Sequence, residues 1–310
     1  MVVPSPTLTR RTLLAGAAGA AGLALLAACG SSGEDSGDEG ADGSGGGSGG
    51  GDAGGVNLLA VFPLQGLLVT GSPQRLPFTL AGTDGAPLDD GPATLDFVVT
   101  DQDGNAVGDP VTVDRHDQGI PTAYYPLIVE FPATGTYQAS ATVDGQELEP
   151  RAFAVVEPSE VSVPQPGQPM VPVDTPTTDD ARGVDPICTR DPECDLHGQT
   201  LTAALASGKP VALAIATPAY CQTAICGPVL DVLLSQEADF PDVAMVHAEV
   251  YKDPEAVDNI ADAQLTPVID AYRLSYEPAL FLANSDGTIA TRLDTIFDEV
   301  EVREALAQLT

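Results

Sequence analysis

The stretch Lys209-Pro-Val-Ala-Leu-Ala-Ile-Ala-Thr-Pro-Ala-Tyr-Cys221-Gln-Thr-Ala-Ile-Cys226-Gly-Pro-Val-Leu230 predicts the architecture of the C-terminal part of this chain. Residues 211–216 form an apolar run of strand length, which is typical of a strand buried on both faces. From residue 229 onward, leucines follow the spacing of a helix. The two cysteines therefore lie at a strand-to-helix junction, where the helix dipole and free N–H groups favour a thiolate. This placement indicates redox chemistry.

The segments after the junction continue to alternate between strands and helices. Residues 243–250 are largely apolar and predict a second strand, inside which His247 is interpreted as a packed residue. Two later segments have helical spacing with Pro at the first position, where it is tolerated. The other predicted elements are a helical turn at 201–205, helices at 254–263 and 267–272, an antiparallel hairpin of strands at 279–282 and 288–292, and a closing helix at 299–309.

This order of elements, with an aromatic residue before the first cysteine and an early proline in the helix, resembles the thioredoxin superfamily. The match covers about residues 166–310. It implies an α/β fold with a C-terminal thioredoxin-like domain over residues 188–310, whose N-terminal arm begins near residue 166. The resemblance also implies that Cys221 is the attacking thiolate and Cys226 the resolving cysteine in thiol-disulfide exchange. Tyr220 and Pro278, the latter at the family's cis-proline position, would position the substrate sulfur.

Two features of the junction depart from the family pattern. Four residues separate Cys221 from Cys226, whereas thioredoxins have two. Glu277 precedes Pro278 where the family usually has Thr or Val, and a carboxylate near Cys221 would raise the pKa of that thiol. The family's buried acid is also absent from the strand at 211–216.

The sequence leaves other functions open for this pair. Four residues is the cysteine spacing of the bacterioferritin-comigratory peroxiredoxins, so a thiol peroxidase that uses Arg273 or Arg292 to polarise peroxide is one alternative. A binding or structural protein with a permanent Cys221–Cys226 disulfide is another. Copper delivery is disfavoured because no histidine follows Pro278. No metal and no cofactor is predicted.

A second pair, Cys188 and Cys194, closes a short polar loop. In an exported protein two nearby cysteines usually form a structural disulfide, which is the prediction here. Zinc binding by these two residues and His197 is less favoured, because no fourth ligand is nearby in the sequence. A second redox pair that exchanges with the first is the remaining interpretation.

The front of the chain is predicted to direct export. Residues 1–28 contain an apolar stretch rich in Ala, Gly and Leu without an acidic residue, as in a signal peptide. Arg10 and Arg11 resemble the pair of a twin-arginine signal. Leu26-Ala-Ala-Cys29-Gly resembles a bacterial lipobox, which implies lipidation of Cys29 and an extracytoplasmic protein anchored to the outer face of the cell membrane. Residues 29–55, rich in Gly, Ser and Asp, are predicted to be a disordered tether.

Length and charge limit the domains and the partners. A chain of 310 residues has room for two domains. With 45 acidic residues against 12 basic ones and a net charge of −33, binding to nucleic acid is not expected. The partners expected from the resemblance are protein thiols or disulfides, or a redox partner protein, outside the cytoplasmic membrane.

Residues 56–158 are predicted to form an all-β sandwich. Short extended runs alternate with turn residues, and Asp144-Gly145 is a strong hairpin signal. The segment that leads to Tyr137 resembles the corner of immunoglobulin-like domains, which a Tyr ties. His116 has no convergent ligands and is interpreted as a polar loop residue. Residues 159–187 are rich in Pro and are predicted to be an extended linker.

Overall fold

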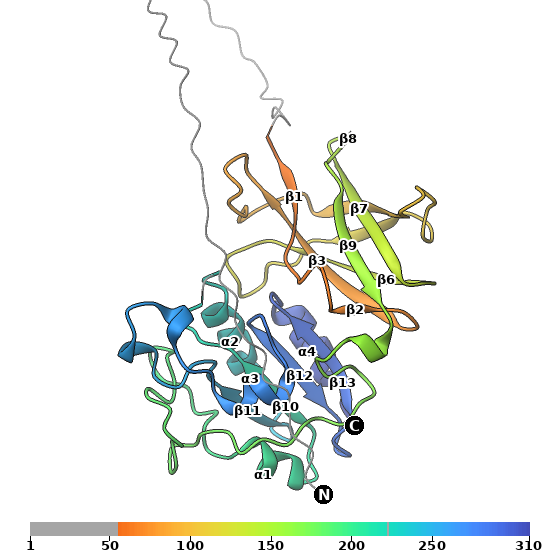
Figure 1. Ribbon diagram of the computed structural model, residues 1–310. Helices are drawn as coiled ribbons and strands as arrows, with labels where there is room; N and C mark the ends of the chain where they lie inside the picture. Colours follow the sequence, from red (N-terminus) through yellow and green to blue (C-terminus); the bar gives the residue numbers. More distant parts are fainter. Residues whose placement is uncertain (1–54, 222) are drawn as a thin grey trace, which may run out of the picture. The chain divides into compact units, whose positions relative to one another are not determined.

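The computed structural model describes residues 55–221 and 223–310 (Figure 1). The predicted export signal with Arg10 and Arg11, the predicted lipidation site Cys29 and nearly all of the predicted tether lie outside these residues. Within the described part of the chain, no helix is both long enough and apolar enough to span a membrane.

The first half of the described chain is built from two β-sheets, as Figure 1 shows. All pairings are antiparallel except that of β2 with β9, which is parallel. The β-rich architecture predicted for residues 56–158 is therefore confirmed. One sheet contains β1 (Asn57–Ala60), β3 (Pro73–Ala81) and β6 (Tyr125–Glu130). The other contains β2 (Leu68–Val69), β9 (Arg151–Val156), β7 (Gly135–Val143), β4 (Thr94–Asp101) and β5 (Val111–Asp114), with β8 (Gln146–Glu147) paired to β7.

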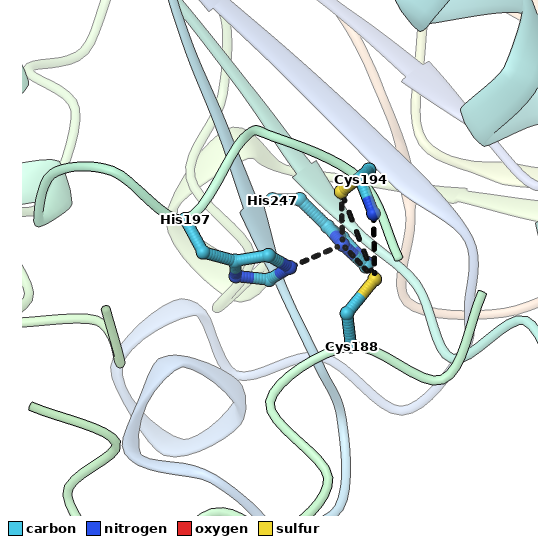
Figure 2. Close-up of side chains that lie close together, drawn as sticks. All are labelled: Cys188, Cys194, His197 and His247. Atoms are coloured by element: carbon cyan, nitrogen blue, oxygen red, sulfur yellow. Dashed lines mark hydrogen bonds between the residues drawn. The ribbon is translucent and has the colours of Figure 1, made fainter. Parts of the chain in front are cut away.

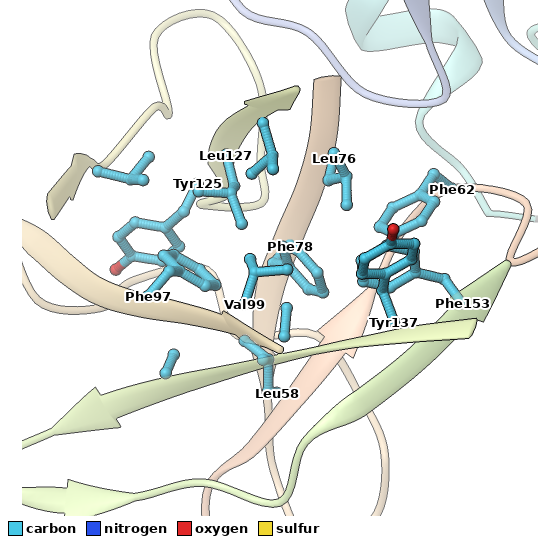
Figure 3. Packing of buried hydrophobic residues seen from close by; sticks show 14 of the residues in the cluster. Leu58, Phe62, Leu76, Phe78, Phe97, Val99, Tyr125, Leu127, Tyr137 and Phe153 are labelled. Carbon is cyan, nitrogen blue, oxygen red and sulfur yellow. The ribbon is translucent and has the colours of Figure 1, made fainter. Parts of the chain in front are cut away.

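A single apolar core fills the space between these two sheets (Figure 3). In β4, buried and exposed residues alternate, so that Phe97 and Val99 point inward beside Phe78 of the other sheet. This alternation is the period-2 pattern of strands with one buried face. Tyr137 packs in the same core, and its hydroxyl donates a 2.7 Å hydrogen bond to the carbonyl of Ala133. This hydrogen bond ties the chain before β7 to the strand itself.

The second half of the described chain, called the α/β half below, contains a four-stranded sheet in the order β11-β10-β12-β13. β10 (Val211–Ile215) and β11 (Ala244–Ala248) are parallel and are joined through α2 (Cys226–Ser235). β12 (Ala279–Ala283) and β13 (Ile289–Asp294) form the predicted hairpin, and β12 pairs antiparallel with β10. The helices α1 (Leu201–Ala206), α3 (Pro267–Tyr272) and α4 (Glu299–Ala307) complete this half.

Both faces of this sheet are covered, which explains why β10 has no polar residue. Ala212 and Ala214 share a cluster with apolar residues of α2 and α4. Val211, Leu213 and Ile215 share a second cluster with residues of α1 and α3. A strand between two helical layers must be apolar on both sides. The predicted order of strand, helix, strand, helix, hairpin and helix is present.

Two helix predictions were wrong in detail. Helix α2 begins at Cys226, three residues before the point at which the sequence shows helical spacing. Residues 254–263 do not form one helix but two 3-10 turns, Pro254–Ala256 and Ile260–Asp262. Asn259 between them is extended, and its side chain accepts a hydrogen bond from the N–H of Ala261. This local capping starts a new turn and interrupts the helix.

The segment predicted to be a linker packs against the α/β half over much of its length. Val163, Met170 and Val173 are buried in the cluster that also contains β10. The N–H of Gly167 donates a hydrogen bond to the carbonyl of Ile289, the first residue of the edge strand β13. The N–H of Met170 donates to the carbonyl of Gly287. Extended backbone can satisfy its hydrogen bonds at a sheet edge without forming a long strand. This arm therefore belongs to the α/β core.

Polar contacts join the β-rich half to helix α4. Arg75 on β3 donates to both carboxylate oxygens of Glu301, at 2.7 and 2.6 Å, and both side chains are largely buried. The Tyr124 hydroxyl also donates to Glu301. His116 is interpreted above as a polar loop residue. Its Nδ1 lies 2.9 Å from Oδ1 of Asp298, the N-cap residue of α4. These contacts connect the β-rich half to α4.

Candidate functional site

Cys221 and Cys226 form a disulfide at the end of the central strand. Their Cα atoms are 5.9 Å apart, whereas residues five apart in a regular helix are about 8–9 Å apart. The shorter distance is reached because only Cys226 is helical, and the N–H of Ala224 turns back to donate to the carbonyl of Cys221 at 3.3 Å. Cys221 is half-buried, and Cys226 is completely buried. An incoming sulfur can therefore reach Cys221 first.

A half-buried carboxyl group, that of Glu277, lies beside the inner sulfur. Glu277 accepts a 2.8 Å hydrogen bond from the N–H of Thr217, and the same oxygen is 3.6 Å from the Cys226 sulfur. Burial raises the pKa of Glu277 to about 7, although the Thr217 hydrogen bond acts in the opposite direction. The sequence analysis expected this carboxylate near Cys221, whereas in the structure it lies beside Cys226. An acid is thus present at the pair, although the strand before the cysteines has none.

Pro278 and Tyr220 come from opposite sides of the same junction. The Glu277–Pro278 peptide bond is cis, and Pro278 is buried at the start of β12. Because Ile215 pairs with Ala279, Pro278 lies beside the chain as it leaves β10 for the cysteines. Tyr220 is half-buried directly before Cys221, and its N–H donates to the carbonyl of Thr217 at 3.2 Å. Their role in positioning a substrate stays a prediction.

A mainly apolar cleft of about 790 Å³ opens beside the pair. One wall is formed by residues 223–225, from the segment between the cysteines, and by Tyr276 and Glu277. Another wall comes from the end of β1 and the residues that follow, 59–63. Such a cleft can accept an apolar peptide segment next to Cys221.

The arginines considered for peroxide chemistry do not contribute to this site. The Arg292 guanidinium donates a 2.9 Å hydrogen bond to the Asp294 carboxylate and a 3.0 Å hydrogen bond to the carbonyl of Pro164. Arg273 is exposed at the C-terminal end of α3. Neither guanidinium group hydrogen-bonds to a described residue of the cysteine loop, so the peroxidase interpretation gains no support.

The second cysteine pair differs from its prediction. Cys188 and Cys194 are buried and free, and their sulfur atoms are 3.7 Å apart. A disulfide requires about 2.05 Å, so the predicted structural disulfide is wrong for this structure. His197 and His247 both lie at these sulfurs. The sequence identified His197 as a neighbour but interpreted His247 only as a packed residue.

Comparisons with known proteins give only distant structural matches. No protein-family model matches the chain, and no curated protein matches it. A structure of MTB dsbF in mixed oxidised and reduced forms is 18% identical, with 36% of this chain and 87% of that chain covered and a TM-score of 0.28. The Lin-41 filamin domain is 13% identical, with 33% and 91% covered and a TM-score of 0.23. We draw no conclusion from either match at these scores.

Proposed function

We propose that the α/β half is a thioredoxin-like domain that exchanges thiols and disulfides with protein partners through Cys221 and Cys226. The observation that carries this proposal is the asymmetry of the pair. One sulfur is accessible, and the other is buried 3.6 Å from a carboxyl group whose pKa burial raises to about 7. A group with a pKa near the working pH is suited to accept and return a proton.

In the reducing direction, the Cys221 thiolate attacks one sulfur of a substrate disulfide. A mixed disulfide forms, and the other substrate sulfur leaves as a thiolate that takes a proton from solvent. The Cys226 thiol then gives its proton to the Glu277 carboxylate. The resulting Cys226 thiolate attacks the Cys221 sulfur, restores the Cys221–Cys226 disulfide and releases the second substrate thiolate. The reverse sequence would oxidise a dithiol.

We further propose that this exchange takes place outside the cytoplasmic membrane, with the chain held at the outer face by a lipid on Cys29. This part rests on the sequence of the first 29 residues, including Arg10 and Arg11. The β-rich half would be an immunoglobulin-like spacer or docking module. Its Tyr137 corner and its own apolar core support that role.

The reduction potential of the pair tests the activity. The full chain is equilibrated with mixtures of reduced and oxidised glutathione, and thiols at Cys221 and Cys226 are counted by alkylation and mass spectrometry. We expect a midpoint between about −120 and −270 mV, the range of exchange catalysts. A midpoint below about −300 mV would identify a permanent structural bond and refute the proposal.

A matched pair of variants tests the roles of the two sulfurs. Cys226→Ser should accumulate a mixed disulfide between Cys221 and glutathione, because the resolving thiol is missing. Cys221→Ser should form its adduct much more slowly, since Cys226 is buried. Equal rates in the two variants would contradict the assignment of Cys221 as the attacking residue.

A further inference from the structure

Four side chains with metal-binding atoms converge in the interior of the α/β half, away from the surface. Cys188, Cys194 and His197 come from the loop before α1, and His247 is the second-last residue of β11. Figure 2 shows the two sulfur atoms and the two imidazole rings facing one another. None of the four residues is more than 8% exposed, and their ligand atoms all lie within 4.8 Å of one another.

The spacing of these atoms is that of a tetrahedral zinc site. Zinc binds sulfur at about 2.3 Å and imidazole nitrogen at about 2.0–2.1 Å, so tetrahedral geometry places two sulfurs about 3.8 Å apart, sulfur and nitrogen about 3.6 Å apart, and two nitrogens about 3.3 Å apart. The Cys188 and Cys194 sulfurs are separated by 3.7 Å, and they lie 3.8 and 3.4 Å from Nδ1 of His247. Nδ1 of His247 and Nε2 of His197 are 3.1 Å apart. These four distances differ from the tetrahedral values by about 0.2 Å or less, and all the ligand atoms lie within 4.8 Å of one another.

The hydrogen bonds around His247 leave the right atom free to bind a metal. Its Nε2 lies 3.0 Å from the carbonyl oxygen of Ala216 and therefore carries the proton. Nδ1 then has a lone pair directed at the two sulfurs, as is usual for a ligating histidine. Nδ1 of His197, by contrast, is buried without a hydrogen-bond partner among the described residues. Binding through Nε2 of His197 would leave that ring to be oriented by the ion and by packing alone.

The loop that carries the cysteines is held in place by further polar contacts. The Glu249 carboxylate accepts two hydrogen bonds from Thr189, one from the N–H at 2.6 Å and one from the hydroxyl at 3.2 Å. Arg190 donates to Asp231 on α2 at 2.6 Å. The Thr189 hydroxyl also accepts from the N–H of Ala219, two residues before Cys221. A metal bound here would therefore stabilise the segment that leads into the exchange site.

We propose that Cys188, Cys194, His197 and His247 bind one structural Zn²⁺ ion. Two thiolates neutralise the charge of the ion, so the buried site carries no net charge. All four positions are filled by protein atoms, which is typical of structural rather than catalytic zinc. Bound thiolates are also protected from exchange with the Cys221–Cys226 disulfide. The ion takes the structural role that the sequence assigned to a second disulfide.

Metal content and cobalt spectroscopy test this site in the full chain carrying Cys29→Ser. After incubation with Zn²⁺ and extensive dialysis, we expect about one zinc per chain. Replacement by Co²⁺ should give a thiolate-to-cobalt charge-transfer band and the intense visible bands of a tetrahedral ion. Cys194→Ser and His197→Ala should each lower the retained metal at least tenfold. The double variant Cys221→Ser/Cys226→Ser is the matched control and should keep both the metal and the spectrum.

A stability measurement keeps the test decisive if the ligand variants fail to fold. In the parent chain, a chelator should lower the melting temperature, and Zn²⁺ but not Mg²⁺ should restore it. The proposal is overturned by fewer than about 0.1 zinc per chain in folded parent protein, by a Cys188–Cys194 disulfide that persists when the protein is folded with Zn²⁺, or by a cobalt spectrum lost only in the control. An unchanged melting temperature on chelation of bound metal would equally rule out a structural role.

Discussion

Replacing Glu277 by glutamine should make the oxidised protein more stable above neutral pH. The carboxyl group is partly withdrawn from water beside the disulfide, which disfavours its charged form, and its pKa is raised from 4.5 to about 7. Glutamine has nearly the same shape and no charge, and its side-chain oxygen can still accept the hydrogen bond of the Thr217 N–H. The substitution therefore removes the titration while the local contacts remain.

The pKa shift sets the size and the sign of the effect. Between pH 4.5 and about 7 the unfolded chain releases the Glu277 proton while the folded chain retains it. The free energy of unfolding consequently falls by about 1.4 kcal/mol per pH unit, or about 3 kcal/mol across this window. Stability from this group is fully present below pH 4.5 and is lost as the pH rises to about 7. Glu277→Gln should match the parent at pH 4 and exceed it by up to about 3 kcal/mol at pH 8.

Urea unfolding of the oxidised parent and the variant at pH 4, 6 and 8 measures this difference. Taking the difference between the two proteins cancels the titration of groups that do not interact with Glu277. Glu255→Gln, at an exposed glutamate of the same half, is the control and should follow the parent at every pH. If the stability difference between parent and Glu277→Gln were the same at pH 4 and pH 8, the carboxyl group would not titrate as argued here. The same variant should also slow resolution of the mixed disulfide by about 100-fold or more, because the proton acceptor is gone.

Two further changes test other parts of the molecule. Glu301→Gln leaves the buried Arg75 guanidinium without its ionic partner, so the free energy of unfolding, measured in urea, should fall by about 3 kcal/mol. A fall of less than about 0.5 kcal/mol would show that water solvates the pair. Cys29→Ala should release the folded chain from membranes, because Cys29 is the predicted point of lipid attachment; sedimentation of the variant with membranes after a high-salt wash would disprove the anchor.

The sequence alone determined the elements of the α/β half and their order. The apolar run at 211–216, the helical spacing after Cys226 and the hairpin turn at 284–287 each depend on residues close together in the chain. Local periodicity of this kind reports which faces of an element are buried, and it does so without knowledge of the partner. For the same reason the helix at 254–263 was predicted wrongly, because side-chain capping by Asn259 competes with helical spacing.

Only the tertiary structure decided which distant groups meet. Glu277 approaches Cys226 across 51 residues, and His247 reaches the Cys188 sulfur across 59. These approaches follow from strand register: β11 lies parallel to β10 and β12 antiparallel to it, and a shift of one residue would turn each side chain to the opposite face of the sheet. Register and loop closure are properties of the whole fold. Three of the four proposed zinc ligands, Cys188, Cys194 and His197, are close together in the sequence, whereas His247 joins them only in the folded chain.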